Sequence, residues 1–200
     1  MSRPRRSEHI REALIQEGIQ QISIHGYHGT GIKQILDEVN VPKGSFYNFF
    51  ASKEAFVAEV IATYSQDLLT QLHEFIEGPG KALSPKRQLE TIYEYTLKKI
   101  AKTDYQQSCL IGSMSTEVGA ESAECRKQLK TATKKWVAFF VNRIEAGQEA
   151  GEFRRDVSAE SLADVYWAAW EGALIKLQMH KKVQPAKASM ALMLNTLMAP

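Results

Sequence analysis

The sequence has few cysteines and no long apolar run. Cys109 and Cys125 lie sixteen positions apart, a spacing that fits neither a metal-ligand cluster nor a disulfide framework. No apolar stretch follows the basic N-terminus and none approaches the length of a membrane span, so we expect neither a signal peptide nor a transmembrane helix. These absences predict a soluble, reduced protein of the cytoplasm.

Common catalytic and cofactor-binding motifs are also missing. The sequence contains no GxSxG, P-loop, HExxH or CxxC, and Gly29-Thr30-Gly31 lacks the third glycine of a dinucleotide-binding loop. His25 and His28 lie beside a glycine turn without an evident acidic partner, and we interpret Glu117 and Glu121 as surface charge. We therefore expect no enzymatic activity, no metal and no cofactor, and a small-molecule enzyme stays open as an alternative.

Charge gives little support for nucleic-acid binding. The formal net charge is +2, and residues 1–55 carry seven basic and six acidic groups, a balance of +1 that the remainder of the chain matches. The arrangement of the basic groups is more informative, because Arg3, Arg5 and Arg6 form an N-terminal arm while Lys43 and Lys53 flank one short segment. A DNA-binding function must therefore be argued from a motif.

Helical periodicity extends along the whole chain, and the alternation typical of strands is not sustained anywhere. Ser7, Thr30 and Ser52 are expected helix caps, and Gly26 and Pro42 are expected breaks. The pattern predicts an all-α fold. The expected helices cover about 7–24, 31–39, 43–50, 52–76, 84–103, 108–118, 121–150, 158–181 and 186–198, the last one after a break at Pro185.

Residues 30–53 have the spacing of a helix-turn-helix followed by a further helix. The apolar positions of residues 32–39 recur at i, i+3, i+4 and i+7, which predicts a short helix with one buried face. Pro42 then suits the start of a third helix of less than three turns. A helix of this size can enter the DNA major groove with its first turn and one exposed face.

The composition of the third helix favours DNA over protein as its partner. If Phe46 and Phe50 point inward, Tyr47 and Asn48 face outward, and Gly44 would permit a close approach of the backbone to DNA. A helical scaffold that binds only protein is the alternative, but it does not explain this combination of glycine, lysine and aromatic residues.

Three stretches of this region resemble the DNA-binding signature of the tetracycline-repressor (TetR) family. They are residues 30–35 (TGIKQI), 41–50 (VPKGSFYNFF) and 52–56 (SKEAF), and the resemblance extends over roughly residues 7–60. It implies a TetR-type helix-turn-helix DNA-binding domain over residues 1–55 and a helical effector-binding and dimerisation domain over residues 56–200. It further implies a transcriptional regulator, most often a repressor, that binds a palindromic double-stranded DNA operator as a dimer and is released by a small-molecule or electrophile effector.

The resemblance also implies roles for individual residues. Thr30 would cap the second helix and touch phosphate, Tyr47 and Lys53 would hold phosphates, and Asn48 and Phe49 would set the sequence preference. Phe49 departs from the histidine that is common in the family, so it offers no polar base contact. The DNA-binding residues implied in this way are Thr30, Lys33, Lys43, Gly44, Ser45, Tyr47, Asn48, Phe49 and Lys53.

Cys109 is the candidate effector or redox residue. The stretch Ser108-Cys109-Leu110 resembles a motif of the NemR-like branch of the family, with Ser108 in place of glycine. Some members of that branch sense electrophiles or oxidants through a cysteine at this place, and a helix N-terminus would favour the reactive thiolate. A buried cysteine that only packs is the alternative. We interpret Cys125, on a charged segment, as a solvated bystander.

The C-terminal half is expected to hold a ligand between its middle helices and to form the dimer. Glu171 stands out, because an acid within an apolar stripe must pair, bind a cation or face water. The candidate pocket residues are Tyr64, Tyr93, Leu97, Met114, Trp136, Phe140, Trp167, Trp170 and Glu171. The last two helices are rich in large apolar residues, and we expect them to pair with their copies as a four-helix bundle in a homodimer.

Overall fold

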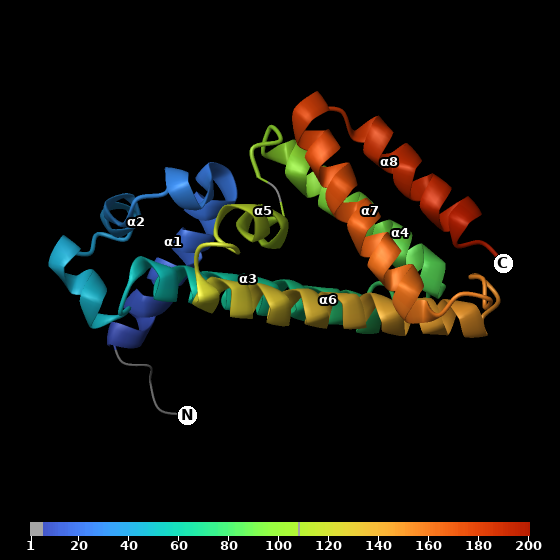
Figure 1. Cartoon of the computed structure of the whole chain (residues 1–200), viewed down its shortest axis with the longest axis horizontal. Coiled ribbons are helices and arrows are strands. Elements are labelled where there is room, and N and C mark those ends of the chain that lie inside the picture. The colour runs from blue at the N-terminus through green and yellow to red at the C-terminus, as the bar shows by residue number, and fades with distance from the viewer. Residues whose placement is uncertain (1–5, 108) are drawn as a thin grey trace. The chain divides into compact units, whose positions relative to one another are not determined.

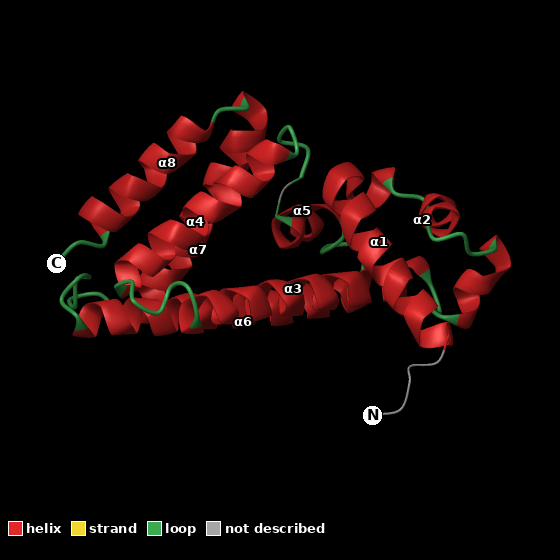
Figure 2. Ribbon diagram, turned by 180° about the vertical axis from the view of Figure 1, so that it is seen from behind, coloured by secondary structure: helices red, strands yellow, loops and turns green. Residues whose placement is uncertain are grey.

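The computed structural model describes residues 6–107 and 109–200, and within them every regular element is a helix (Figure 1). Figure 2 shows no strand in this part of the chain, which confirms the predicted all-α fold. The elements are α1 (Arg6–Gly29), α2 (Ile32–Glu38), η1 (Lys43–Asn48), α3 (Lys53–Glu77), α4 (Pro85–Lys102), α5 (Leu110–Glu117), α6 (Ala123–Glu149), α7 (Ala159–His180), α8 (Val183–Leu192) and η2 (Met193–Leu197). None of the helices described is both long enough and apolar enough to cross a membrane.

The described chain divides into two compact units. The first contains residues up to Asp67 together with Leu110–Ala132, and the second contains Leu68–Cys109 and Thr133–Pro200. The expected domain boundary at residue 55 lies inside α3, which continues without interruption to Glu77. The expected helix-turn-helix region therefore shares a compact unit with α5, a segment that we expected in the other domain.

Some of the observed helix ends differ from the expected ones, and others agree with them. Thr30 does not cap α2: Gly31 holds the cap position without a side-chain hydrogen bond, so that prediction is wrong. Pro185 is not a break either, because it lies in the first turn of α8, where a missing N–H group costs little. The Ser52 cap is confirmed, since its Oγ accepts from the Ala55 amide at 3.1 Å.

Close packing of α1 against α3 forms the core of the first unit. Leu14 and Ile22 of α1 are fully buried, as are Phe56 and Val60 of α3. Between them Gly18 permits the close approach, because a Cβ atom there would lie 2.4 Å from Phe56 Cζ and 2.9 Å from Val60 Cγ2. The absence of a side chain at Gly18 therefore sets the distance between α1 and α3.

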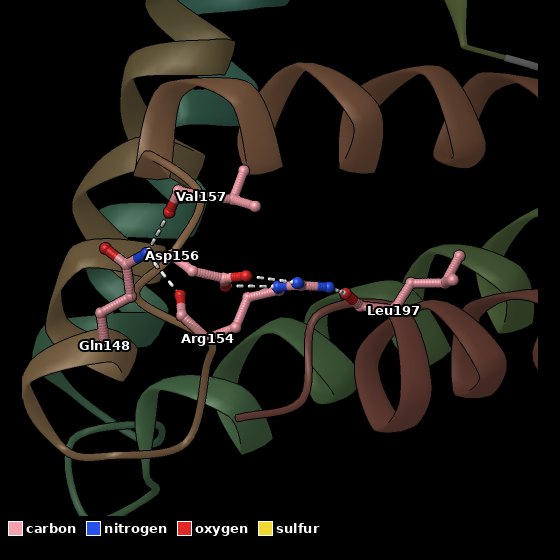
Figure 3. A network of polar contacts seen from close by, with 5 residues as sticks. All are labelled: Gln148, Arg154, Asp156, Val157 and Leu197. Carbon is pink, nitrogen blue, oxygen red and sulfur yellow. Dashed lines mark hydrogen bonds and ion pairs between the residues drawn. The ribbon is translucent and has the colours of Figure 1, made fainter.

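A polar network fixes the loop between α6 and α7 in the second unit (Figure 3). Gln148 Nε2 donates to the carbonyl oxygens of Arg154 at 2.7 Å and Val157 at 2.9 Å. The Arg154 guanidinium forms a bidentate ion pair with Asp156 and also reaches the Leu197 carbonyl oxygen. This loop thereby ties the C-terminal segment to the ends of α6 and α7.

We expect Gly18→Ala to destabilise the protein by about 1–3 kcal/mol, because the added methyl group overpacks the contact with Phe56 and Val60. Gly44→Ala is the matched control, since a Cβ atom at Gly44 would meet nothing within 4 Å. Urea unfolding of both variants checks this. Equal stability of the two variants would contradict the packing described for Gly18.

Candidate functional site

The turn between α2 and η1 is built around Asn40, which adopts a left-handed backbone with φ 56°. The Val41 amide donates to the Leu36 carbonyl at 2.9 Å and the Asn40 amide to the Asp37 carbonyl at 3.2 Å. This is the Schellman arrangement, which satisfies the last carbonyls of a helix. Asparagine tolerates the left-handed region better than most residues, so this position both ends α2 and aims the chain toward η1.

The short helix η1 packs against the rest of the first unit through buried phenylalanine side chains. Phe46, Phe50 and Phe56 are at most 3% exposed, and their ring centroids lie 4.8–5.6 Å apart. Tyr47, next in the chain, is 69% exposed. The inward and outward directions predicted for Phe46, Phe50 and Tyr47 are therefore confirmed. The helix itself is a 3₁₀-helix over Lys43–Asn48 and ends earlier than expected.

The residues expected to face DNA differ in their exposure, from fully exposed side chains to the buried Thr30. Lys33, Lys43, Gly44, Tyr47 and Asn48 are exposed, and Ser45 and Phe49 are partly exposed. Lys33 is engaged with Asp37 one turn later at 2.6 Å, and this hydrogen bond raises the pKa of Lys33. Arg3 and Arg5 of the expected N-terminal arm lie outside the described residues.

Thr30, which is buried, and Lys53, which is partly exposed, hold the turn that precedes α2. Thr30 is 1% exposed, and its hydroxyl donates to the Gly26 carbonyl at 2.7 Å. Lys53 Nζ donates to the Tyr27 and Thr30 carbonyls, each at 2.8 Å, and lies 4.2 Å from the centre of the Tyr27 ring. Burial lowers the pKa of Lys53. Both side chains thus organise the site from within, and a phosphate contact by Lys53 would use its remaining N–H group.

Glu117, interpreted from the sequence as surface charge, is a structural member of this site. Its Oε2 accepts from the backbone amides of Tyr27 at 2.7 Å and His28 at 3.4 Å. Gly26, just before them, has φ 71° and bends α1, and a Cβ atom there would lie 2.6 Å from both Glu117 carboxylate oxygens. Gly26, an expected helix break, was the only feature of the sequence that pointed to this bend. The role of Glu117 left no local pattern, because the contact spans ninety positions of the chain.

Aromatic side chains of α4, α6 and α7 form a continuous cluster in the second unit. Trp167 contacts Trp136 with ring centroids 5.7 Å apart, and Phe140 contacts Trp167 and Trp170 at 6.1 and 5.8 Å. Tyr93 joins through Trp170 at 4.9 Å. The structure thereby brings together most of the expected pocket residues. Leu97 is buried in the same unit, whereas Tyr64 and Met114 belong to the first unit.

Buried polar atoms on α6 and α7 of the second unit lack partners among the described residues. They are Trp136 Nε1, Tyr166 Oη and Glu171 Oε1. Burial raises the pKa of Glu171 to about 7, an effect that a hydrogen bond from the Cys109 thiol partly offsets. Such atoms cost free energy unless something bonds to them, so they are more informative about a candidate ligand site than the packed aromatic rings are.

The two cysteines have different surroundings. Cys109 is 9% exposed and lies directly before α5, and its thiol donates to the Glu171 carboxylate. Cys125 is fully buried, so its interpretation as a solvated bystander is wrong. Its Sγ contacts the Glu54 carbonyl at 3.5 Å, and burial raises the pKa of this thiol. The neighbouring Arg126 guanidinium donates to the Gly119 and Ala120 carbonyls.

An apolar stripe on α7 stays exposed in the single chain. Val165, Ile175 and Met179 are 53%, 59% and 72% exposed, and they recur at intervals that place them on one helix face. Leu192 and Leu197 near the C-terminus are also more than half exposed. A stripe of this kind marks a surface that another protein covers.

Comparison with known proteins finds the same architecture in bacterial regulators. Residues 14–60 match the family described as "Bacterial regulatory proteins, tetR family", and residues 85–193 match "Tetracyclin repressor-like, C-terminal domain". The chain is 34% identical over 176 residues to the HTH-type transcriptional repressor DhaR of Mycobacterium sp. (strain GP1), covering 88% of this chain and 86% of that protein. It is 28% identical over 199 residues to the HTH-type transcriptional repressor NemR of Escherichia coli (strain K12), covering 97% of each.

Solved structures agree with these relationships. The regulatory protein TetR from Rhodobacter sphaeroides superposes with a TM-score of 0.85 at 25% identity, covering 93% of this chain and 97% of that chain. The reduced form of Escherichia coli NemR superposes with a TM-score of 0.81 at 25% identity, covering 94% and 97%. The helix-turn-helix residues, both matched regions and the shared fold together show that this chain belongs to the tetR family of bacterial regulatory proteins.

Proposed function

We propose that this chain is a repressor that binds a palindromic DNA operator as a homodimer in the cytoplasm and leaves it when an effector binds the second unit. As a member of the tetR family it is a DNA-binding, ligand-responsive transcriptional regulator and not an enzyme. The main support for the proposal is the exposed face of η1, whose opposite face is fixed in the core by buried phenylalanine side chains. Lys43, Tyr47 and Asn48 on that face supply a charge, a hydroxyl and an amide for phosphates and base edges.

DNA binding is tested with a duplex that the wild-type chain enriches from a random pool. We expect an inverted repeat, and Lys43→Ala/Tyr47→Ala should weaken its binding about 10–100-fold through lost phosphate contacts. The slope of log affinity against log salt should fall by about 0.9 for each lost charged contact. Fluorescence anisotropy over a salt series measures both.

The matched control is Tyr95→Ala/Lys99→Ala, which removes the same residue types at the same spacing from exposed positions of α4. This variant should bind the duplex like the wild type. Equal weakening by the two double variants would exclude η1 as the element that contacts DNA.

The homodimer is proposed to form through α7 and the C-terminal segment. Its support is the exposed stripe of Val165, Ile175 and Met179, which follows a seven-residue spacing through Ala168 and Gly172. Small residues between large ones allow two helices to approach closely. Two reading helices, one from each protomer, would also explain how so short an element reads enough base pairs for specificity.

We expect Ile175→Glu/Met179→Glu to convert the dimer to a monomer, because pairing would bury the new carboxylates without partners. Tyr95→Glu is the control, since it places a carboxylate on an exposed apolar position of α4. Sedimentation velocity of the three proteins measures their masses. A dimer that survives the α7 substitutions places the interface elsewhere.

The effector is proposed to be a small organic cation bound by the aromatic cluster and Glu171. Within the described residues Glu171 forms no ion pair, although one of its oxygens is buried without a hydrogen bond. A cation against aromatic faces and a carboxylate gains both cation–π and Coulomb attraction. The Cys109 thiol donates a hydrogen bond to this carboxylate and so acts there in its protonated form, whereas attack on an electrophile requires the thiolate. The arrangement therefore favours a reversible ligand over covalent modification.

Benzyltrimethylammonium should bind the wild type and should bind Glu171→Gln at least about tenfold more weakly, with benzyl alcohol as the neutral probe. Because the pKa of Glu171 is raised to about 7, its carboxylate gains charge between pH 6 and pH 8, and affinity for the cation should rise over that interval. Tryptophan fluorescence reports binding, since all three tryptophans of the chain are in the cluster.

Glu160→Gln, an exposed acid in the first turn of the same helix, is the control and should bind the cation like the wild type. If benzyl alcohol binds as tightly as the cation, or if Glu171→Gln retains full affinity, the cationic effector is excluded. In that case Cys109→Ser tests the remaining electrophile mechanism.

A further inference from the structure

The carboxylate of Glu117 supplies hydrogen bonds that the backbone of α1 cannot make. The bend at Gly26 interrupts the helix, and a helix break leaves amides without carbonyl partners from the preceding turn. Glu117 accepts from two of them, Tyr27 at 2.7 Å and His28 at 3.4 Å. Carboxylate acceptors form stronger hydrogen bonds than neutral ones, so this contact is a substantial part of what holds the turn.

The same turn determines where the DNA-facing helix lies. Lys53 of α3 donates to the Tyr27 and Thr30 carbonyls, and the Tyr27 hydroxyl donates to Glu54 at 3.1 Å. α2 begins two residues after Thr30 and leads directly to η1. Residues 26–30 are thus held by α3 on one side and by α5 on the other. Loss of either contact frees the segment from which α2 and η1 extend.

The position of Glu117 on α5 gives this contact a regulatory meaning. α5 has eight residues: it begins at Leu110, directly after Cys109, and ends at Glu117. The Cys109 thiol contacts Glu171, the acid of the proposed effector site. Cys109 therefore connects directly along the chain to the start of a short helix whose last residue holds the turn.

We propose that Glu117 is a positioning residue for DNA binding, and that α5 keeps η1 in its DNA-reading position only while Glu117 holds the Tyr27 and His28 amides. The regulatory part rests on the proposed effector function of the second unit. The positioning part rests only on DNA binding, and it is the part that the following experiment tests.

Glu117→Ala removes both hydrogen bonds, whereas Glu117→Gln retains an amide oxygen as an acceptor. Glu121→Gln is the matched control, because Glu121 is an exposed acid four residues further on and its change removes the same charge. Anisotropy titrations measure binding to the enriched duplex and to a scrambled duplex of equal composition. We expect Glu117→Ala to bind the enriched duplex about tenfold more weakly and the scrambled one within about twofold of wild type, with Glu117→Gln intermediate and Glu121→Gln unchanged.

A double-mutant cycle with Gly26→Ala tests the contact from its other side. A methyl group at Gly26 would meet the Glu117 carboxylate, so Gly26→Ala should weaken specific binding less in the Glu117→Ala background than in the wild type. Additive effects would overturn the proposal, as would wild-type affinity of Glu117→Ala or equal weakening on both duplexes. A wild-type chain that prefers no sequence would instead refute the proposed function itself. Melting temperatures identify any unfolded variant, and Glu117→Gln then decides the outcome.

Discussion

The arrangement of the DNA-binding region depends on the hydrogen bonds of the turn between α1 and α2. Gly26 allows the backbone to leave the helix at a positive φ, and the polar groups released there must be satisfied from outside the local chain. The Glu117 carboxylate accepts from backbone amides of the turn, and the Lys53 ammonium donates to backbone carbonyls of the turn. The Thr30 hydroxyl donates to the Gly26 carbonyl. These contacts join the turn to α3 and to α5, which are distant in the sequence. The conformation of the turn therefore depends on the folding of the unit around it.

Much of the fold follows from periodicity, while the contacts that organise the site do not. The apolar spacing of residues 32–39 together with the resemblance to the TetR signature placed the helix-turn-helix, and the structure confirms the short helix α2 and buries Phe46 and Phe50. The capping role expected of Thr30 was wrong, because α2 begins one residue later with Gly31 at its cap position, and the Thr30 hydroxyl donates to the Gly26 carbonyl. Glu117 and Cys125 were misjudged for a different reason, since neighbouring charges in sequence do not reveal a partner far along the chain.

The polar groups of the turn in the first unit have hydrogen-bond partners, whereas some buried polar groups of the second unit have none within the described chain. The aromatic rings at positions 136, 140, 167 and 170 pack against one another as an ordinary core would. The unpartnered atoms of Trp136, Tyr166 and Glu171 distinguish this core from one built for stability alone. In a ligand-responsive regulator, such a residual cost is the means by which a ligand gains differential affinity for one conformation.

We propose that the first unit contacts DNA through η1 and that the preceding turn holds η1 in place. Hydrogen–deuterium exchange of the full chain, with and without the enriched duplex, measures both at once. We expect slower exchange over residues 43–49, slower exchange of the Tyr27 and His28 amides, and no change over α4. Protection concentrated in residues 68–109 and 133–200, with none at η1, would contradict it.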